Sequence, residues 1–347
     1  MNNVSATTLR RLVPFALTLG LLAAIVASLC IGAYPMSFWR AADIVGHLAL
    51  PWALPEDLPW PAKEVAVVQV LRLPRVLLAV FVGIALGISG TALQGMMRNP
   101  LVGPDLVGVS SGAACGYVLG VLFDCPPGVC VAVAFFGGMT AMGCAYGLAK
   151  LARGAEGIGL IIAGIFIGAF CMACVGLAQF LANDGQLQNM VFWLMGSLTR
   201  AKPNTVWTLA APTLVCGSVL MAMRWRLNLL SLGDVDAASL GVPTRLLRFA
   251  VVALVSWMVA AQVSVSGIVG WVGLVIPHVA RMLVGPDHRR LLPASALLGG
   301  LFVLLVDDFT RVALRAEVPI GVLTSLIGTP FLVYLFWKKK TKGWNDG

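Results

Sequence analysis

The sequence predicts an all-α polytopic membrane protein with about ten transmembrane helices. Its 347 residues are 59% hydrophobic and only 11% charged, whereas a soluble domain carries roughly 25% charged residues. Apolar runs of about 20 residues recur along the chain, and this is the length that an α-helix needs to cross a bilayer. A helix also satisfies its own backbone hydrogen bonds within the hydrocarbon layer. The repeated runs therefore indicate a bundle of membrane spans.

The first span is predicted at residues 13–33, directly after Arg10 and Arg11. Its apolar stretch is longer than the 7–15 residues of a typical signal-peptide core, and no small-x-small cleavage site follows it. We therefore interpret this run as a retained transmembrane helix.

The other nine spans follow the apolar runs that lie between proline-containing loops. Pro100, Pro126, Pro203 and Pro243 are among the prolines at these breaks, as is typical of helix boundaries. The expected spans are 76–97, 107–123, 129–149, 158–182, 204–223, 249–265, 268–283, 291–306 and 319–337. Together with the first span they predict a single transmembrane domain over residues 1–347. No Asp, Glu or Lys lies within these bounds, so the spans contain no carboxylate for proton or sodium coupling.

The distribution of Lys and Arg orients the bundle. Ten spans place both termini on one side of the membrane. If that side is the cytoplasm, 16 Lys and Arg residues lie there and eight lie outside, which agrees with the positive-inside rule. The net charge of +9 therefore follows from topology, and it requires no nucleic-acid partner.

The eight cysteines do not predict a metal site. Six of them lie in apolar runs, where cysteine packs as a small hydrophobic residue. Cys171 and Cys174 have CxxC spacing, but no His or acidic ligand lies near them. Cys125 and Cys130 flank a Pro-Pro-Gly loop and could pair if that loop faces an oxidising compartment.

Four blocks in the loops and helix ends carry a family resemblance. They read SGTALQGMMRNPLVGPDLVGVSSGA (89–113), LGDVDAASLG (232–241), GWVGLVIPHVARMLVGPDHRRLLP (270–293) and VPIGVLTSLIGTPFLVYLFWKKK (318–340). In this order and with ten spans, the chain resembles the permease family of ABC importers for iron-siderophores, haem and vitamin B12, often called the FecCD family. The resemblance runs from about Leu71 to Lys340.

The resemblance implies a transporter subunit rather than an enzyme. Such a permease lies in the inner (cytoplasmic) membrane and pairs with a second copy, which we expect to form a homodimer. Two ATP-binding subunits bind below, holding ATP and Mg²⁺, and a periplasmic binding protein delivers the substrate. This chain is then expected to bind no cofactor itself. The residues agree, because no GxxxxGK[ST] motif for ATP phosphates is present.

The predicted cargo is a bulky metal chelate that crosses by alternating access. A ferric siderophore is the first choice on the breadth of the family, and haem and vitamin B12 are the alternatives. A stand-alone channel or secondary carrier is the competing interpretation from another class, and it predicts transport without an ATPase subunit. A membrane-embedded enzyme has no support, because the spans contain no paired carboxylates, HExxH motif or Ser-His pair.

The polar stretch between spans six and seven predicts short helices under the membrane. A helix can form from Asp234 to Leu240, with its acidic residues near the N-terminus, where the helix dipole favours them. Gly241 is a natural stop before Pro243. Two short helices joined at Gly241 resemble the family's coupling helices, which sit in a cleft of the ATPase. The resemblance assigns coupling to Gly233, Asp234, Ala237, Leu240 and Gly241. The alternative is a helix that rests on lipid headgroups, where an anionic leaflet would repel its aspartates.

The loop after span two is the candidate cytoplasmic gate. In the family this loop helps to close the pathway, which places Asn99 and Leu101 at the constriction. An amide and an apolar side chain can close a pore by hydrogen bonding and by dewetting, although an ordinary Asn-Pro turn has the same sequence. The loop before span five should contribute Gly157 and Ile158, where the family's small hydroxyl residues are missing.

Three arginines are candidates for docking the binding protein. In the family, arginines at the positions of Arg72 and Arg75 form salt bridges to glutamates on that protein. Arg311 is expected to join them, although its spacing to Pro319 is one residue short of the usual pattern, which makes Arg315 the rival. Arginine–carboxylate pairs suit an interface that must form and release. The alternative is that these side chains reach the lipid headgroups.

Overall fold

The computed structural model confirms the all-α prediction. It describes residues 2–32, 34, 36–49, 60–151, 158–313 and 318–343, and this part of the chain contains helices but no strand. The main helices are α1 (Asn2–Cys30), α2 (Phe38–Ala49), α4 (Leu73–Met97), α5 (Val109–Leu122), α6 (Pro127–Leu151), α7 (Ile158–Leu181), α8 (Asp184–Leu194), α9 (Pro203–Ala222), α12 (Thr244–Ser266), α13 (Val272–Val284), α14 (His288–Ala313) and α15 (Ile320–Gly343). Short elements are α3 (Ala62–Ala66), the π-helical turn η1 (Val67–Arg72), the 3-10 turn η2 (Pro104–Val107), α10 (Arg224–Leu230) and α11 (Asp234–Ser239).

Seven helical segments of the described chain are long and apolar enough to cross a membrane. They are residues 12–30 of α1, the continuous run from α3 to α4, and helices α6, α7, α9, α12 and α14. Three shorter apolar helices, α5, α13 and residues 320–335 of α15, complete the bundle. The protein is therefore an integral membrane protein that crosses the bilayer several times.

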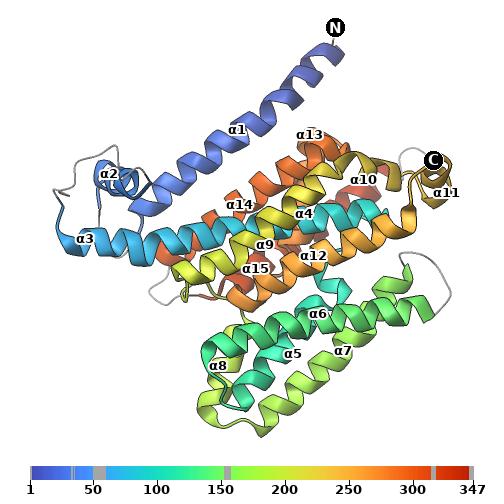
Figure 1. Cartoon of the computed structure of the whole chain (residues 1–347). Coiled ribbons are helices and arrows are strands. Elements are labelled where there is room, and N and C mark those ends of the chain that lie inside the picture. The colour runs from blue at the N-terminus through green and yellow to red at the C-terminus, as the bar shows by residue number, and fades with distance from the viewer. Residues whose placement is uncertain are drawn as a thin grey trace.

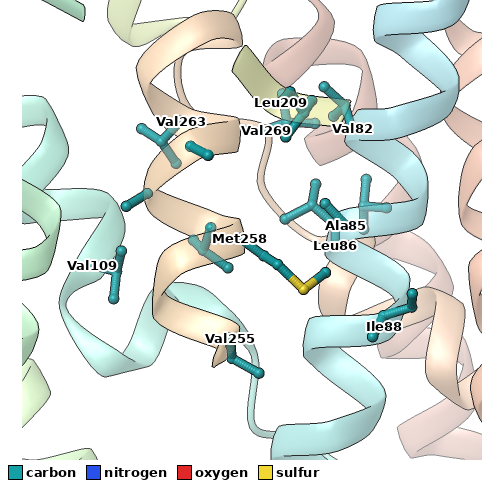
Figure 2. Packing of buried hydrophobic residues seen from close by; sticks show 14 of the residues in the cluster. Val82, Ala85, Leu86, Ile88, Val109, Leu209, Val255, Met258, Val263 and Val269 are labelled. Carbon is teal, nitrogen blue, oxygen red and sulfur yellow. The ribbon is translucent and has the colours of Figure 1, made fainter. Parts of the chain in front are cut away.

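Helix α4 lies at the centre of the larger helix group. It packs against α9, α12, α13 and α14, whereas α5, α6 and α7 pack on one another and meet the larger group through α12. Figure 1 shows these two groups, with α5 to α8 below the rest. Figure 2 shows the apolar packing of α12 against α4 within the larger group, where Met258 of α12 extends towards Leu86 of α4. Both side chains are almost fully buried.

Glycines allow α4 to touch its neighbours backbone to backbone. A Cβ atom on Gly83 would lie 2.0 Å from the carbonyl oxygen of Gly299 in α14. A Cβ atom on Gly90 would lie 1.7 Å from the carbonyl oxygen of Gly273 in α13. Such contacts are typical of membrane helices, since small residues permit close van der Waals packing there. They fix α4, α13 and α14 relative to one another.

The helix containing span two is longer than the expected span at 76–97. Residues 62–97 form one helical run of 36 residues, and its π-helical turn η1 ends just before Pro74 in the first turn of α4. Proline has no N–H to donate, so a local change in the hydrogen-bond ladder lets the helix continue through it. Arg72 and Arg75 therefore lie inside this helix and not in a loop before it.

The prediction of spans without acidic residues is wrong for span nine. Helix α14 does not end at 306 but continues to Ala313, so it includes Asp307 and Asp308. Both carboxylates are buried. The helix can contain them because each accepts hydrogen bonds or forms ion pairs with neighbouring side chains, which offsets the loss of hydration.

Candidate functional site

A large cavity opens at the end of the bundle where α4 begins and α12 ends. Its volume is about 980 Å³, at the upper end of the range for sites that enclose small ligands. It is lined by residues from α4, α5, α6, α8, α9, α12 and α14, from the loop between α8 and α9, and from the start of α15 with the turn before it. The charged lining residues are Arg75, Arg200, Lys202 and Asp307. We call this end of the molecule the cavity end.

Helix α8 supplies the aromatic wall of the cavity. The helix begins with a capping box, in which the Asn183 side chain accepts from the Gln186 N–H and the Gln186 side chain accepts from the Asn183 N–H. This arrangement satisfies two N–H groups that the first turn would otherwise leave unpaired. Trp193 of α8 stacks on Tyr117 of α5 with ring centroids 3.9 Å apart, and Phe192 also lines the cavity. The short helix is thus held firmly against α5.

The Tyr117 ring also positions a cation. Arg200 Nη1 donates to the Tyr117 hydroxyl at 3.1 Å, and Arg200 Nη2 donates to Asn189 Oδ1 at 2.9 Å. Tyr117 is buried, while Arg200 and Lys202 are exposed. No motif in the sequence marks either cation as a site residue. Their predicted position outside, against the positive-inside rule, was the available signal.

The three arginines predicted to dock a binding protein are largely buried at the cavity end. Arg72 is only 6% exposed; it donates to the Leu29 carbonyl at 2.7 Å and to the Tyr34 carbonyl. Arg75 Nε lies 3.0 Å from Asp307 Oδ1 and 3.1 Å from Oδ2. The structure therefore gives these two arginines partners within the chain.

Arg311 joins the same cluster from the end of α14. Its Nε lies 3.2 Å from Asp307 Oδ2, and its Nη2 contacts Asp308 Oδ1 and donates to Ser28 Oγ. Ser28 in turn donates to Asp308 Oδ1 at 2.6 Å. Arg75, Arg311, Asp307, Asp308 and Ser28 thus form one buried network between α1, α4 and α14, which we call the ion-pair cluster. The spacing of Asp307 and Arg311 at i and i+4 was the sequence signal for a continued helix.

The predicted coupling residues lie at the opposite end of the bundle, in and around α11. The Gly241 N–H donates to the Ala238 carbonyl and the Val242 N–H to the Ala237 carbonyl, while Gly241 has a positive φ of 77°. This pattern is a Schellman motif, which ends a helix with a left-handed residue. Ala237 is buried and Leu240 is 59% exposed. The prediction of two short helices joined at Gly241 is wrong in one respect. The helix after Gly241 is the span α12 itself, and the two short helices are α10 and α11, which precede it.

Arg248 connects α11 to the last turn of α4. Its Nη2 lies 2.5 Å from Asp234 Oδ1, and its Nη1 donates to the Met96 carbonyl at 3.1 Å. The side chain of Arg98 also lies close to the start of α11, since a Cβ atom on Gly233 would lie 3.1 Å from Arg98 Nη1. We call the contact between Asp234, Arg248 and Met96 the arginine bridge. Asp234 and Arg248 are 14 residues apart, so no local spacing predicted it.

Helix α10 is hydrogen-bonded to the turn before α14. Asn228 donates to Asp287 Oδ1 at 2.6 Å and accepts from the His288 N–H at 2.8 Å. Burial opposes ionisation of Asp287, but the hydrogen bonds from the Arg289 N–H and the Asn228 amide hold the pKa of this carboxyl below its usual value. Both short helices are therefore tied to the bundle by polar contacts.

The predicted gate residues form a turn directly after α4. The Asn99 side chain accepts from the Leu101 N–H at 2.9 Å, and Leu101 is 58% exposed. Ile158 is exposed at the start of α7, and Gly157 lies outside the described residues. The chain after the turn reaches α7, since a Cβ atom on Gly164 would lie 2.4 Å from the Leu106 carbonyl oxygen.

Cysteines and histidines add no metal centre to this description. Among the described residues, no group of three or more His, Cys, Asp or Glu side chains could hold a metal ion. Cys125 and Cys130 are free thiols, and the Cys130 thiol donates to the Cys125 carbonyl.

Comparisons with known proteins identify the family. The model of the FecCD transport family matches residues 20–338. The chain is 39% identical to the molybdate import system permease protein MolB of Haemophilus influenzae, over 96% of this chain and 97% of that protein. It is 41% identical to the hemin transport system permease protein HmuU of Yersinia pestis, over 78% and 83% of the two chains.

A solved structure has the same fold. It is an inward-facing conformation of a transporter assigned to the metal-chelate type of ABC transporters, with a TM-score of 0.83, 37% identity, and coverage of 94% of this chain and 98% of that one. The family model covers residues 20–338, and the MolB relative and the solved structure cover 96% and 94% of this chain. The chain belongs to the FecCD transport family, the permeases of type II ABC importers.

Proposed function

We propose that this chain is the permease subunit of an ATP-driven importer that moves a bulky metal chelate into the cytoplasm by alternating access. The observation that carries the proposal is the position of the cavity of about 980 Å³ at one end of α4 and of the arginine bridge at the other. A substrate chamber and an ATPase contact at opposite ends of one central helix are what such a permease requires.

Ferric siderophore is the first choice of cargo, with haem and vitamin B12 as alternatives. Relatives named for hemin, cobalamin and iron chelatin support a chelate. The relative named for molybdate import is equally similar, and it adds a small oxyanion to the candidates. A cavity of this volume accommodates a bulky ligand, which supports the chelate.

At the α11 end we propose the contact with two ATP-binding subunits, which hold the ATP and Mg²⁺. Val235 and Leu240 are exposed on and beside the short helix, and they offer apolar side chains to a partner surface. The shape of α11 and of its two ends depends on Gly233, Asp234, Ala237 and Gly241. A second copy of the chain completes the pathway as a homodimer in the inner (cytoplasmic) membrane, and both termini lie in the cytoplasm.

The gate proposal rests on the turn at Asn99 and Leu101. The turn follows α4 directly, and Arg248 holds the last turn of that helix through the Met96 carbonyl. Movement of α11 would therefore reach the turn through one side chain. Ile158 begins the neighbouring helix α7, and Gly157 keeps its assignment from the family resemblance alone.

Docking of a binding protein by Arg72, Arg75 and Arg311 has a defined requirement. Each arginine must exchange carbonyl or carboxylate partners within the chain for glutamates of the incoming protein. Arg40 is a more accessible cation nearby, since its side chain is 49% exposed beside Glu64. The docking proposal therefore predicts a rearrangement of the ion-pair cluster when the binding protein arrives.

Reconstitution tests the proposed function against the channel or carrier alternative. The full chain is placed in proteoliposomes with its ATP-binding subunits and binding protein, and uptake of a ⁵⁵Fe-labelled ferric siderophore is measured. We expect uptake only when ATP and all components are present. Equal uptake by the permease alone would instead establish a stand-alone channel or carrier.

A further inference from the structure

We propose that the cavity receives anionic cargo, and that Arg200 and Lys202 are the residues that select for negative charge. The inference rests on the proposed function and deepens it by naming the charge class of the substrate. The ligand is an anion large enough to use the cavity, such as a metal chelate with a net negative charge.

The charge of the cavity wall is the first observation. Among the described lining residues the cations are Arg75, Arg200 and Lys202, and Asp307 is the only carboxylate. Asp307 pairs with Arg75 at 3.0 Å and with Arg311 at 3.2 Å, so its charge is balanced within the ion-pair cluster. Arg200 and Lys202 also line the cavity, and neither forms an ion pair with a carboxylate among the described residues.

The presentation of Arg200 is the second observation. Its contacts at Tyr117 and Asn189 are to neutral oxygens, and in the described part of the chain no carboxylate pairs with it. A guanidinium carries five N–H donors in a rigid fork, and these two hydrogen bonds leave donors available to a ligand. The buried Tyr117, stacked on Trp193, fixes the fork in place. Such a fork suits bidentate contact with an anionic oxygen.

The surroundings add neutral donors and an aromatic surface. Ser197 and Thr199 line the cavity next to Arg200 and share a hydrogen bond of 2.9 Å. Phe192 is exposed on the wall. Asp124 lies in a smaller adjoining cavity, where it accepts from the Gln186 amide at 2.9 Å. The wall that meets the ligand therefore combines cations, hydroxyls and one aromatic face.

Equilibrium dialysis against the purified full chain in nanodiscs tests the charge preference directly. The probes are molybdate, a ⁵⁵Fe-labelled anionic ferric tris-catecholate and a neutral ferric tris-hydroxamate of similar size. At low salt, where screening is weakest, we expect the anionic chelate to bind about tenfold more tightly than the neutral one, a ratio equivalent to one charge-assisted contact. Equal binding of the two chelates, or no binding of any probe, would overturn the inference.

Variants separate charge from structure. Arg200→Gln combined with Lys202→Gln should weaken the anionic chelate about tenfold and leave the neutral chelate unchanged. Arg200→Lys should retain most of the anion preference, because the charge remains while the fork is lost. Arg245→Gln is the control, an exposed arginine outside the cavity, and it should change nothing. An effect of Arg245→Gln equal to that of the double variant would assign the preference to general surface charge.

Uptake by the complete importer keeps the two proposals distinguishable. ATP-dependent uptake without any charge preference in binding leaves the proposed function intact and removes the inference about charge. Charge-selective binding by a chain that shows no ATP-dependent uptake would support the inference about charge and overturn the proposed function.

Discussion

Arginines occupy both ends of the bundle, but they serve two different kinds of contact. At the cavity end, the ion-pair cluster joins α1, α4 and α14, helices that also pack along their lengths. At the other end, the arginine bridge holds α11, which has six residues and buries only Ala237. At the cavity end, the ion pairs are added to helices that already pack against one another. At the α11 end, the ion pair and hydrogen bond of Arg248 supply most of the contact between α11 and α4.

This difference predicts separate consequences of mutation. Loss of charge at the cavity end should destabilise the protein strongly, because it removes a shared ionic partner from between packed helices. Loss of charge at the α11 end should leave the fold intact and disconnect the short helix from α4. Four variants test this comparison.

The largest effect is expected for Asp307→Ala, which removes the shared carboxylate of Arg75 and Arg311. Removing one partner from a buried ion-pair network destabilises a protein by about 3–5 kcal/mol, and we expect a loss towards the lower end of this range in the free energy of unfolding measured in detergent micelles, because Arg311 keeps its contact with Asp308. Asp184→Ala is the matched control, since Asp184 is exposed in the first turn of α8; its loss should remain below about 1 kcal/mol. Similar stability of the two variants would mean that the cluster contributes little.

Gly241→Val should abolish coupled transport. Gly241 has space for a side chain, since no atom lies within 4 Å of the point where a Cβ atom would stand. Its φ of 77°, however, would cost a β-branched residue about 1–3 kcal/mol of backbone strain. We expect poor assembly with the ATPase, or ATP hydrolysis without uptake. Gly241→Asn should retain most uptake, because Asn tolerates the left-handed conformation. Normal uptake by Gly241→Val at normal expression would contradict the coupling role.

Arg248→Gln should lower the number of substrates moved per ATP several-fold, while the bundle itself stays folded. The change removes the ion pair to Asp234 and weakens the hydrogen bond to the Met96 carbonyl, contacts that contribute roughly 1.5–3 kcal/mol when one partner is charged. Uptake and ATP hydrolysis are measured together in proteoliposomes. Arg245→Gln, an exposed change one turn earlier in α12, is the control. A parallel fall in hydrolysis and uptake would indicate a loss of assembly instead.

The smallest effect is expected for Asn99→Ala combined with Leu101→Ala. Truncation of exposed side chains removes little buried area, so stability should change by less than about 0.5 kcal/mol. Passive leakage of a small dye from sealed vesicles without ATP should rise, because the constriction loses an amide and an apolar side chain. Leu246→Ala, at an exposed position of α12, is the control. Equal leakage from both variants would place the gate outside this turn.

The sequence predicted best the features that depend on local patterns. Apolar runs with proline breaks correspond to the helices, and the Gly241 stop predicted the end of α11 within one residue. The surroundings of the charged residues could not be predicted in this way. Asp307 meets Arg75, which is 232 residues away, and Arg72 is covered by carbonyl groups of residues 29 and 34. These contacts depend on how helices that are distant in the sequence pack together. The spacing of residues within one segment therefore does not predict them.

The unbroken helical run from Ala62 to Met97 has a mechanical consequence. Its 36 residues extend over roughly 54 Å at 1.5 Å per residue, well beyond a hydrocarbon layer of about 30 Å. A rod of that length amplifies rotation, since a tilt of about 5° displaces one tip by roughly 5 Å relative to the other. The glycine contacts to α13 and α14 would act as its fulcrum. A small displacement at the α11 end of this helix would then arrive, enlarged, at the opposite surface of the membrane.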